Sequence, residues 1–256
     1  MKYVLANWKM YPTPDRAVEL LATVQAGLED RLPAIPTALT VIVCPPSVSI
    51  PSLQRVIEPR LVRLGAQNCH WESEGPYTGE ISAVMLKGLV DYVLVGHSER
   101  RAAGETDLQV ARKVAAVADA GLTPILFVGE DEPTDTALGE AERRLTQGLA
   151  EVDLAMHQVL IVYEPTWAIG AEQPARAKHV SRVVEHLKER LGDLGASEPR
   201  ILYGGTVNGD NVEQFADVEA LDGVGATRAG LEAAEFLRIV DRVALAGSDP
   251  GGPGAS

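Results

Sequence analysis

One glutamate lies at the end of an apolar segment, where a carboxylate is unexpected. Val159–Tyr163 has the composition of a buried strand, and Glu164 and Pro165 follow it at once. A carboxylate at the dry end of a sheet, beside a loop that closes over it, is a candidate base for removing a proton from carbon. Closure excludes water and strengthens local electrostatics. A surface glutamate fits this segment equally well, so other residues must decide.

A lysine and a histidine follow two other strand-like segments. Lys9 lies in Asn7–Trp8–Lys9–Met10, where its ammonium group could hold a phosphate and stabilise a developing oxyanion. The alternative is an ordinary surface lysine. His97 is followed by Ser98–Arg101; if a helix begins there, its backbone N–H groups disfavour the imidazolium, and the neutral ring can donate a hydrogen bond to a carbonyl. The alternative for His97 is a hydrogen-bonded core histidine.

Two glycines and a threonine form a candidate phosphate loop. In Gly204–Gly205–Thr206 the glycines let backbone N–H groups approach a phosphate, and Thr206 adds a hydroxyl. A Gly-Gly turn is weak evidence by itself, but this one lies between the seventh and eighth strand-like segments, where barrel phosphate sites are common. The net charge of −13 gives a poor long-range field for an anion, so an anion site must be built locally.

Strand-like segments alternate with longer amphipathic segments along the chain. The predicted strands are Tyr3–Ala6, Thr40–Val43, Leu61–Ala66, Tyr92–Val95, Pro124–Val128, Val159–Tyr163, Arg200–Tyr203 and Gly223–Ala226. The predicted helices are Asp107–Ala120, ended by Gly121; Ala137–Leu149; Ala175–Leu191, ended by Gly192; and Leu231–Leu245. This alternation predicts the α/β class and a single (β/α)8 barrel over residues 1–246, ahead of an open doubly wound sheet. The Gly/Pro/Ser-rich segment 247–256 is predicted to be a disordered tail.

Polar residues gather at the carboxyl ends of the predicted strands. They are Asn7 and Lys9, Gln67 and Asn68, His97 and Glu99, Glu130, Glu164, and Gly204–Thr206. Parallel strands bring these ends to one face of a barrel, and barrel enzymes build their sites on that face. We therefore expect the site at the C-terminal ends of the strands, with Glu99 and Arg100 supplying one charge of each sign beside it.

Composition excludes several classes of partner and cofactor. With 46% hydrophobic and 23% charged residues the chain can bury a large core, and its acidic balance argues against nucleic acid and anionic membranes as partners. Cys44 and Cys69 form neither a disulfide framework nor a metal-ligand cluster, so no metal is expected. No apolar segment has the length of a membrane span or a signal peptide, so we expect a cytoplasmic protein.

Four motifs in this order resemble the triosephosphate isomerase family. They are Asn7–Met10, Val95–Arg101, Tyr163–Gly170 and Tyr203–Val207, and the similarity extends from Tyr3 to about Val240. The resemblance implies a TIM barrel that interconverts dihydroxyacetone phosphate and glyceraldehyde 3-phosphate through an enediolate without a cofactor, in glycolysis and gluconeogenesis. It makes Glu164 the base and His97 the neutral electrophile, with Lys9 and Asn7 on the substrate and Glu99 supporting Lys9 and His97.

The same resemblance implies a lid and a dimer. The lid comprises Pro165, Thr166, Trp167, Ala168, Ile169 and Gly170, and the Gly170 amide would reach the phosphate. The family is usually homodimeric, and its third loop inserts into the partner's active site. Here that loop is Gln67–Glu80, with Thr78 and Glu80 as interface candidates.

The chain departs from the family pattern in three places. After Gly170 it reads Ala171–Pro174, shorter than the usual lid and with Glu172 in place of a glycine. Thr227 and Arg228 replace two glycines of the eighth loop, so either Arg228 grips the phosphate or it swings outward. Phe127 replaces a cysteine and could shift the base.

These departures leave two alternatives open. Isomerases of four-carbon erythrulose phosphates, such as L-erythrulose 1-phosphate, show a similar lid and an arginine in the eighth loop. A barrel that binds a sugar phosphate without turning it over is the other alternative, although a pure scaffold has no need of Asn7, Lys9, His97, Glu99 and Glu164 at strand ends.

Overall fold

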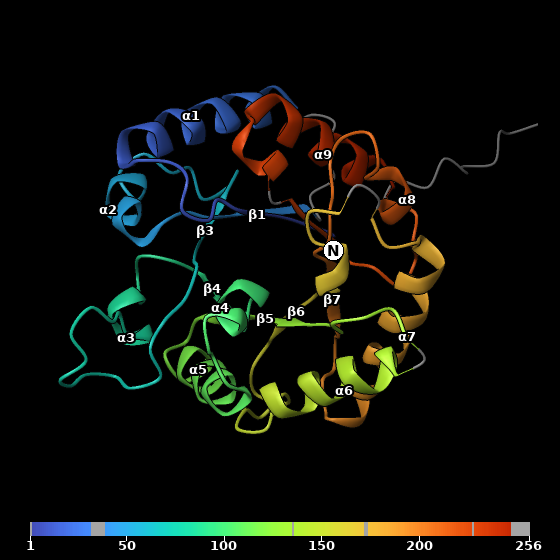
Figure 1. Cartoon of the computed structure of the whole chain (residues 1–256). Helices are drawn as coiled ribbons and strands as arrows, with labels where there is room; N and C mark the ends of the chain where they lie inside the picture. The colour runs from blue at the N-terminus through green and yellow to red at the C-terminus, as the bar shows by residue number, and fades with distance from the viewer. Residues whose placement is uncertain (1, 32–38, 135, 172–173, 227, 247–256) are drawn as a thin grey trace, which may run out of the picture.

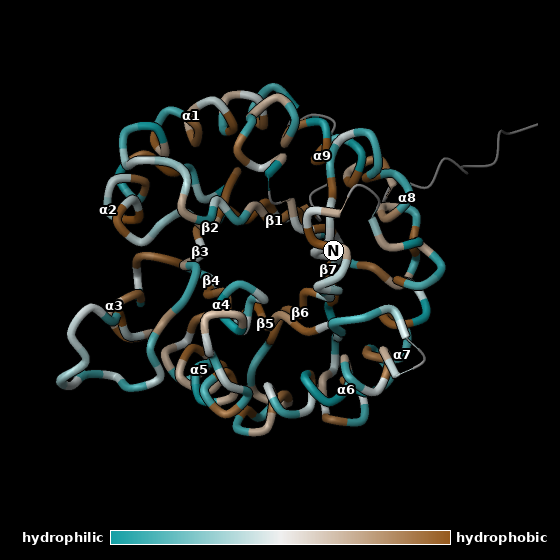
Figure 2. The backbone as a smooth tube through the Cα atoms, viewed as in Figure 1, coloured by the Kyte–Doolittle hydropathy of each residue, from teal (hydrophilic) through white to brown (hydrophobic). Residues whose placement is uncertain are grey.

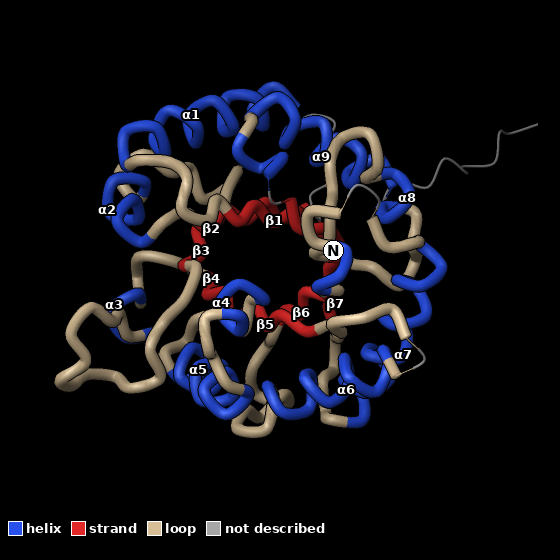
Figure 3. Tube along the Cα trace, in the orientation of Figure 1, coloured by secondary structure: helices blue, strands red, loops and turns tan. Residues whose placement is uncertain are grey.

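The computed structural model describes residues 2–31, 39–134, 136–171, 174–226 and 228–246. Eight parallel strands close into a barrel in chain order, visible as the red ring in Figure 3. The strands are β1 (Lys2–Asn7), β2 (Leu39–Cys44), β3 (Arg63–Ala66), β4 (Tyr92–Val95), β5 (Thr123–Val128), β6 (Leu160–Tyr163), β7 (Arg200–Tyr203) and β8 (Gly223–Ala226). β8 pairs with β1, which closes the ring and leaves no free strand edge.

Helices surround the barrel (Figure 1). The α-helices are α1 (Pro14–Arg31), α2 (Ile50–Leu53), α3 (Ala83–Leu86), α4 (Ser98–Ala102), α5 (Asp107–Asp119), α6 (Ala137–Gly148), α7 (Ala177–Asp193), α8 (Glu213–Ala216) and α9 (Ala233–Ala246). Short 3₁₀ helices occur at η1 (Ser47–Ser49), η2 (Thr166–Ala168) and η3 (Arg228–Leu231). The loop before α3 projects from the ring, at the lower left of Figure 1.

The core has two layers because strand side chains alternate. Along β1, Tyr3 and Leu5 belong to the apolar cluster inside the barrel, whereas Val4 and Ala6 belong to the cluster between strands and helices. Figure 2 shows the hydrophobic colouring along the strands and more hydrophilic colouring on the outer helices. The barrel interior is therefore a packed core, and polar chemistry is confined to its ends.

The structure confirms the predicted (β/α)8 barrel and shifts some predicted boundaries. β3 begins at Arg63, not Leu61, because the N–H groups of Leu61 and Val62 donate to the Glu58 carbonyl in a turn. Gly121 follows α5 at φ 78°, as its predicted role as a helix stop requires.

Two helix predictions need correction. α7 does not stop at Gly192 but runs through it to Asp193, and Gly195 takes the left-handed conformation at φ 97°. The long helix α1 did not appear among the predicted helices at all.

The predicted tail and several loop residues lie outside the described residues. Residues 247–256, Glu172, Gln173 and Thr227 are among these. Within the described ranges, no helix is long and apolar enough to cross a membrane. The described His, Cys, Asp and Glu side chains form no group of three able to hold a metal ion.

Candidate active site

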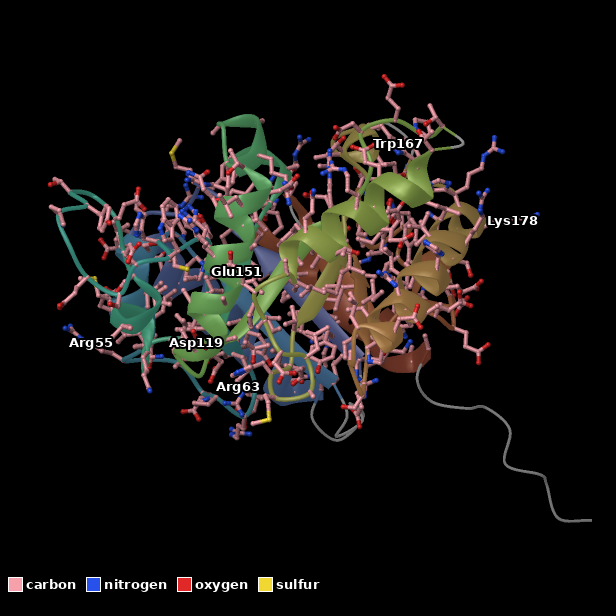
Figure 4. The ribbon with its side chains drawn as sticks, turned by 90° about the horizontal axis from the view of Figure 1, so that it is seen from below. Arg55, Arg63, Asp119, Glu151, Trp167 and Lys178 are labelled. Carbon is pink, nitrogen blue, oxygen red and sulfur yellow. The ribbon has the colours of Figure 1, made fainter. Side chains whose placement is uncertain are left out.

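Parallel strand order brings the predicted site residues to one end of the barrel. Asn7 ends β1, Glu164 and Gly204 directly follow β6 and β7, and His97 follows β4 after Gly96. Trp167 lies in the loop after β6, two residues beyond Pro165. Figure 4 shows it at the opposite end of the barrel from Arg63 and Asp119. The site residues therefore lie on the C-terminal face of the barrel, as the sequence predicts.

Lys9 has an unusual backbone conformation that hydrogen bonds from neighbouring loops hold in place. Its φ of 48° lies in the left-handed region that non-glycine residues seldom occupy. The Lys9 N–H donates to Asn7 Oδ1 at 3.0 Å, and Gln67 Nε2 donates to the Lys9 carbonyl at 2.8 Å. Gln67 also donates to the Cys44 carbonyl at 2.9 Å, so it ties the ends of three strands together.

Glu99 pairs with Lys9 but is not buried. Lys9 Nζ lies 2.6 Å from Glu99 Oε1, while the Glu99 side chain is 58% exposed. Arg100 is exposed as well, so these two charges are not buried together beside the site. An exposed pair adds little to stability, and the contact's main effect is to hold the Lys9 ammonium group in place.

His97 has one ring nitrogen whose role is fixed by the chain. It is the N-cap of α4, and its Nδ1 accepts a hydrogen bond from the Glu99 N–H at 3.1 Å. In the neutral ring the proton therefore resides on Nε2. That nitrogen is buried, lies 3.3 Å from Glu164 Oε1 and has no aligned hydrogen-bond partner in the described part of the chain. It is an available donor, as the sequence predicts if a helix starts here.

Glu164 is a buried carboxylate with a raised pKa. Its side chain is 3% exposed, and Oε2 accepts the Ser98 N–H at 3.0 Å. Burial raises the pKa of Glu164, and the nearby His97 and the Ser98 hydrogen bond offset part of this effect. A base with a raised pKa binds the abstracted proton more strongly.

The end of the neighbouring strand, β5, packs closely against the backbone of Glu164. The Glu164 N–H donates to the Val128 carbonyl at 2.7 Å, and a Cβ on Gly129 would lie 2.2 Å from the Glu164 carbonyl oxygen. Glycine is therefore required at 129. Phe127 packs against the His97 ring, with centroids 4.9 Å apart, so it contacts the histidine side of the site.

The lid Pro165–Gly170 is docked on both sides. On one side Thr166 Oγ1 donates to Asp131 Oδ1 at 3.0 Å, and Trp167 Nε1 donates to Glu130 Oε1 at 3.0 Å. On the other side Thr206 Oγ1 donates to the Ala168 carbonyl at 2.9 Å and accepts the Gly170 N–H at 3.2 Å. The lid thus bridges the loops after β5 and β7.

A cavity of about 400 Å³ lies between the lid and η3. Lys9, Gly170, Thr206 and Arg228 are among its lining residues. The Arg228 side chain is exposed, and its guanidinium forms no hydrogen bond or ion pair with any other described side chain. The sequence-predicted phosphate residues Gly170, Thr206 and Arg228 therefore face one cavity. Thr227 cannot be placed because it lies outside the described residues.

Gly204 and Gly205 are needed for packing. A Cβ on Gly204 would lie 2.3 Å from Val162 Cγ1, and one on Gly205 would lie 2.2 Å from Tyr203 Oη. Neither is among the lining residues of the cavity. Their contact with a phosphate stays a prediction.

Glu130 is a buried residue of the site to which the sequence pattern alone gives no role. Its side chain is fully buried, and Oε1 accepts from Tyr163 Oη at 2.8 Å in addition to Trp167. The available signal is its position two residues after an apolar strand, which resembles the position of Glu164 directly after β6.

The fold and site together define a class of protein. A buried carboxylate, a histidine N–H and a lysine meet at the mouth of a (β/α)8 barrel, beneath a lid and beside a cavity with an unpaired arginine. These groups suit a sugar-phosphate isomerase. Such an enzyme moves a proton between adjacent carbons, which needs a base, and passes through an oxyanion, which needs hydrogen-bond donors and positive charge.

Comparison with known proteins gives the family. The family model described as triosephosphate isomerase matches residues 2–243. A triosephosphate isomerase of Trichodesmium erythraeum is 41% identical over 242 residues, covering 93% of this chain and 97% of that protein. One of Dehalococcoides mccartyi is 38% identical over 249 residues, covering 94% and 96%. The chain belongs to the triosephosphate isomerase family.

A solved structure agrees. The crystal structure of triosephosphate isomerase from Bartonella henselae matches with a TM-score of 0.83 at 30% identity, covering 94% of this chain and 98% of that one. The resemblance of the four sequence motifs to this family is confirmed.

The buried state of Glu164 predicts a pH-dependent stability difference. A raised folded pKa means that the folded chain holds the proton more tightly, so stability is fully present below the ordinary value of 4.5 and falls as pH rises through the folded pKa. Glu164→Gln does not titrate. Its Tm should therefore exceed that of the wild type by more at a pH above the folded pKa of Glu164 than at pH 4, with about 2–4 °C for each kcal/mol gained.

Exposed Glu151→Gln is the matched control, and it should show no such trend. Calorimetry or circular dichroism at several pH values measures both variants. A Tm difference for Glu164→Gln that is constant or shrinks with rising pH would contradict the burial argument.

Proposed function

We propose that this chain interconverts dihydroxyacetone phosphate and glyceraldehyde 3-phosphate by proton transfer through an enediolate, without a cofactor. The observation that carries the proposal is the 3.3 Å approach of the buried Glu164 Oε1 to the protonated Nε2 of His97. A base and a hydrogen-bond donor so placed can serve a carbon acid and its neighbouring carbonyl together.

The residues have separate roles in this chemistry. Glu164 takes a proton from C1 of the ketose and returns it to C2, while the His97 Nε2–H stabilises the oxygen that gains negative charge. Lys9 adds a positive charge, and Asn7 and Glu99 hold Lys9 in position through the contacts at 3.0 and 2.6 Å. The triosephosphate isomerase family is itself the standard example of a glutamate base paired with a neutral histidine.

The phosphate is bound in the cavity beneath the lid. The Arg228 guanidinium supplies donors to it from the cavity wall. The Gly170 amide and the Thr206 hydroxyl exchange their present lid contacts for the phosphate when it binds, and the Gly204–Gly205 amides, which do not line the cavity, reach it only after a local rearrangement. Arg228 supports this role because it lines the cavity and pairs with no described carboxylate. A guanidinium without a carboxylate partner can offer two parallel N–H groups to a phosphate.

The relatives named above support the three-carbon substrate over a four-carbon ketose phosphate or a non-catalytic barrel, because each is a triosephosphate isomerase. The corresponding setting is glycolysis and gluconeogenesis in the cytoplasm.

The active form is a homodimer. In support, the loop Gln67–Glu80 projects from the barrel (Figure 1), and its residues Thr78 and Glu80 are exposed. Exposed Tyr77 at the same tip adds an apolar group that a partner would cover.

Removing the base tests the proposal. Glu164→Gln keeps the shape of the side chain but cannot accept the proton, so kcat should fall about 10²–10⁴-fold while the fold is retained. A coupled assay with glyceraldehyde 3-phosphate measures this, and Glu151→Gln is again the control. Near-wild-type turnover in Glu164→Gln would show that Glu164 is not the catalytic base.

The role of Arg228 has its own test. Arg228→Ala should raise KM for the triose phosphate about tenfold or more, since a charge-assisted contact to the phosphate is lost. Arg238→Ala is the matched control, because Arg238 is exposed and paired with Asp210 at 2.6 Å and Glu235 at 2.8 Å. If KM is the same in Arg228→Ala and the wild type, Arg228 does not bind the phosphate.

A further inference from the structure

The Glu130 carboxylate collects hydrogen-bond donors from three different elements. Its Oε1 accepts from Tyr163 Oη of β6 at 2.8 Å and from Trp167 Nε1 of the lid at 3.0 Å, and it lies 3.0 Å from His179 Nε2 of α7. The Glu130 side chain is fully buried, whereas His179 is 26% exposed. Glu130 Oε2 has no hydrogen-bond partner in the described ranges, so Oε1 alone orients the carboxylate.

The position of the hydrogen on the His179 ring follows from two neighbouring groups. Its Nε2 is 3.0 Å from Glu130 Oε1 and 3.0 Å from Tyr163 Oη. An unprotonated Nε2 would place its lone pair against a carboxylate oxygen, which is repulsive. Nε2 therefore carries a hydrogen in both the neutral and the charged ring, and it donates to Glu130 in either state.

Glu130 in turn fixes the first half of the lid. Its backbone carbonyl accepts the Thr166 N–H at 3.0 Å and Thr166 Oγ1 at 3.2 Å, while its side chain holds Trp167. The His179 ring also meets the Trp167 ring edge-on, with centroids 5.7 Å apart and planes at 72°. His179 thus contacts both the anchor of the lid and the lid itself.

We propose that His179 is a positioning residue for the lid, acting through Glu130 to hold Trp167 in its docked orientation. This inference rests on the proposed function to the extent that the lid closes over the substrate. Losing one of three donors would leave a buried carboxylate less well satisfied and free to rotate away from Trp167. The lid would then spend less time in the orientation that completes the site.

The kinetic test compares two substitutions of His179. His179→Phe keeps a ring but removes the donor, and kcat/KM should fall about tenfold, with changes in both kcat and KM, since a displaced lid weakens positioning as well as binding. His179→Gln can still donate through its amide, so it should stay within about twofold of the wild type.

The same helix provides a matched control. His186 of α7 also places Nε2 against a glutamate, 2.9 Å from Glu142 Oε2, but on the outer surface and with no contact to the lid. His186→Phe should leave kcat/KM unchanged. If His179→Phe does not fold, His179→Ala takes its place, because it only removes atoms from a partly exposed side chain.

A spectroscopic test needs no turnover. The chain has 3 tryptophans, so 5-fluorotryptophan labelling gives a simple ¹⁹F NMR spectrum in which Trp167→Phe assigns the lid signal. In His179→Phe the Trp167 signal should shift or broaden, while the signals of buried Trp8 and of Trp71 stay in place. This result would hold even if the wild type failed to isomerise the triose phosphate, which would refute the proposed function alone.

A double-mutant cycle tests the path from His179 to the lid. If His179 acts through the docking of Trp167, then His179→Phe should cost much less kcat/KM in a Trp167→Phe background than in the wild type. Independent, additive losses would overturn the proposal. So would a folded His179→Phe or His179→Ala with wild-type kcat/KM and an unchanged Trp167 signal.

Discussion

The structure depends on keeping one carboxylate, that of Glu164, almost out of water at the end of a barrel strand. Burial alone opposes ionisation, so the site must supply compensation without neutralising the base. The Ser98 N–H at 3.0 Å and the His97 Nε2 at 3.3 Å provide it, and both come from the start of the same short helix, α4. The helix start that orients His97 therefore also holds Glu164.

The rest of the barrel mouth follows from that arrangement. Gly129 is required because the β5 end passes against the Glu164 backbone, and the loop after β5 then carries Glu130 and Asp131 to the lid. The lid begins at the residue after the base, so the strand that positions Glu164 also positions Pro165. Chemistry and closure are coupled by chain connectivity as well as by packing.

Much of this could be predicted from the sequence. The period of the strands and the polar residues at their ends indicated the barrel and the face of the site, because parallel topology leaves few other arrangements. The sequence predicted a neutral, donating His97 only on the condition that a helix begins there, and α4 begins at Ser98 with His97 as its N-cap. The end of α7 was not, because Gly192 has helical geometry here and the turn falls on Gly195. Contacts between distant segments, such as Glu130 with His179, depend on three-dimensional packing, which the local pattern does not encode.

The most direct test of the account is the fate of the abstracted proton. Dihydroxyacetone phosphate is converted by the wild-type protein in D₂O, and the products are followed by ¹H NMR. Because protonated Glu164 can exchange with solvent before it returns the proton, we predict deuterium at C2 of the glyceraldehyde 3-phosphate and at C1 of the recovered ketose. Deuterium incorporated at these carbons by Glu164→Gln as fast as by the wild type would contradict the role of Glu164 as the base.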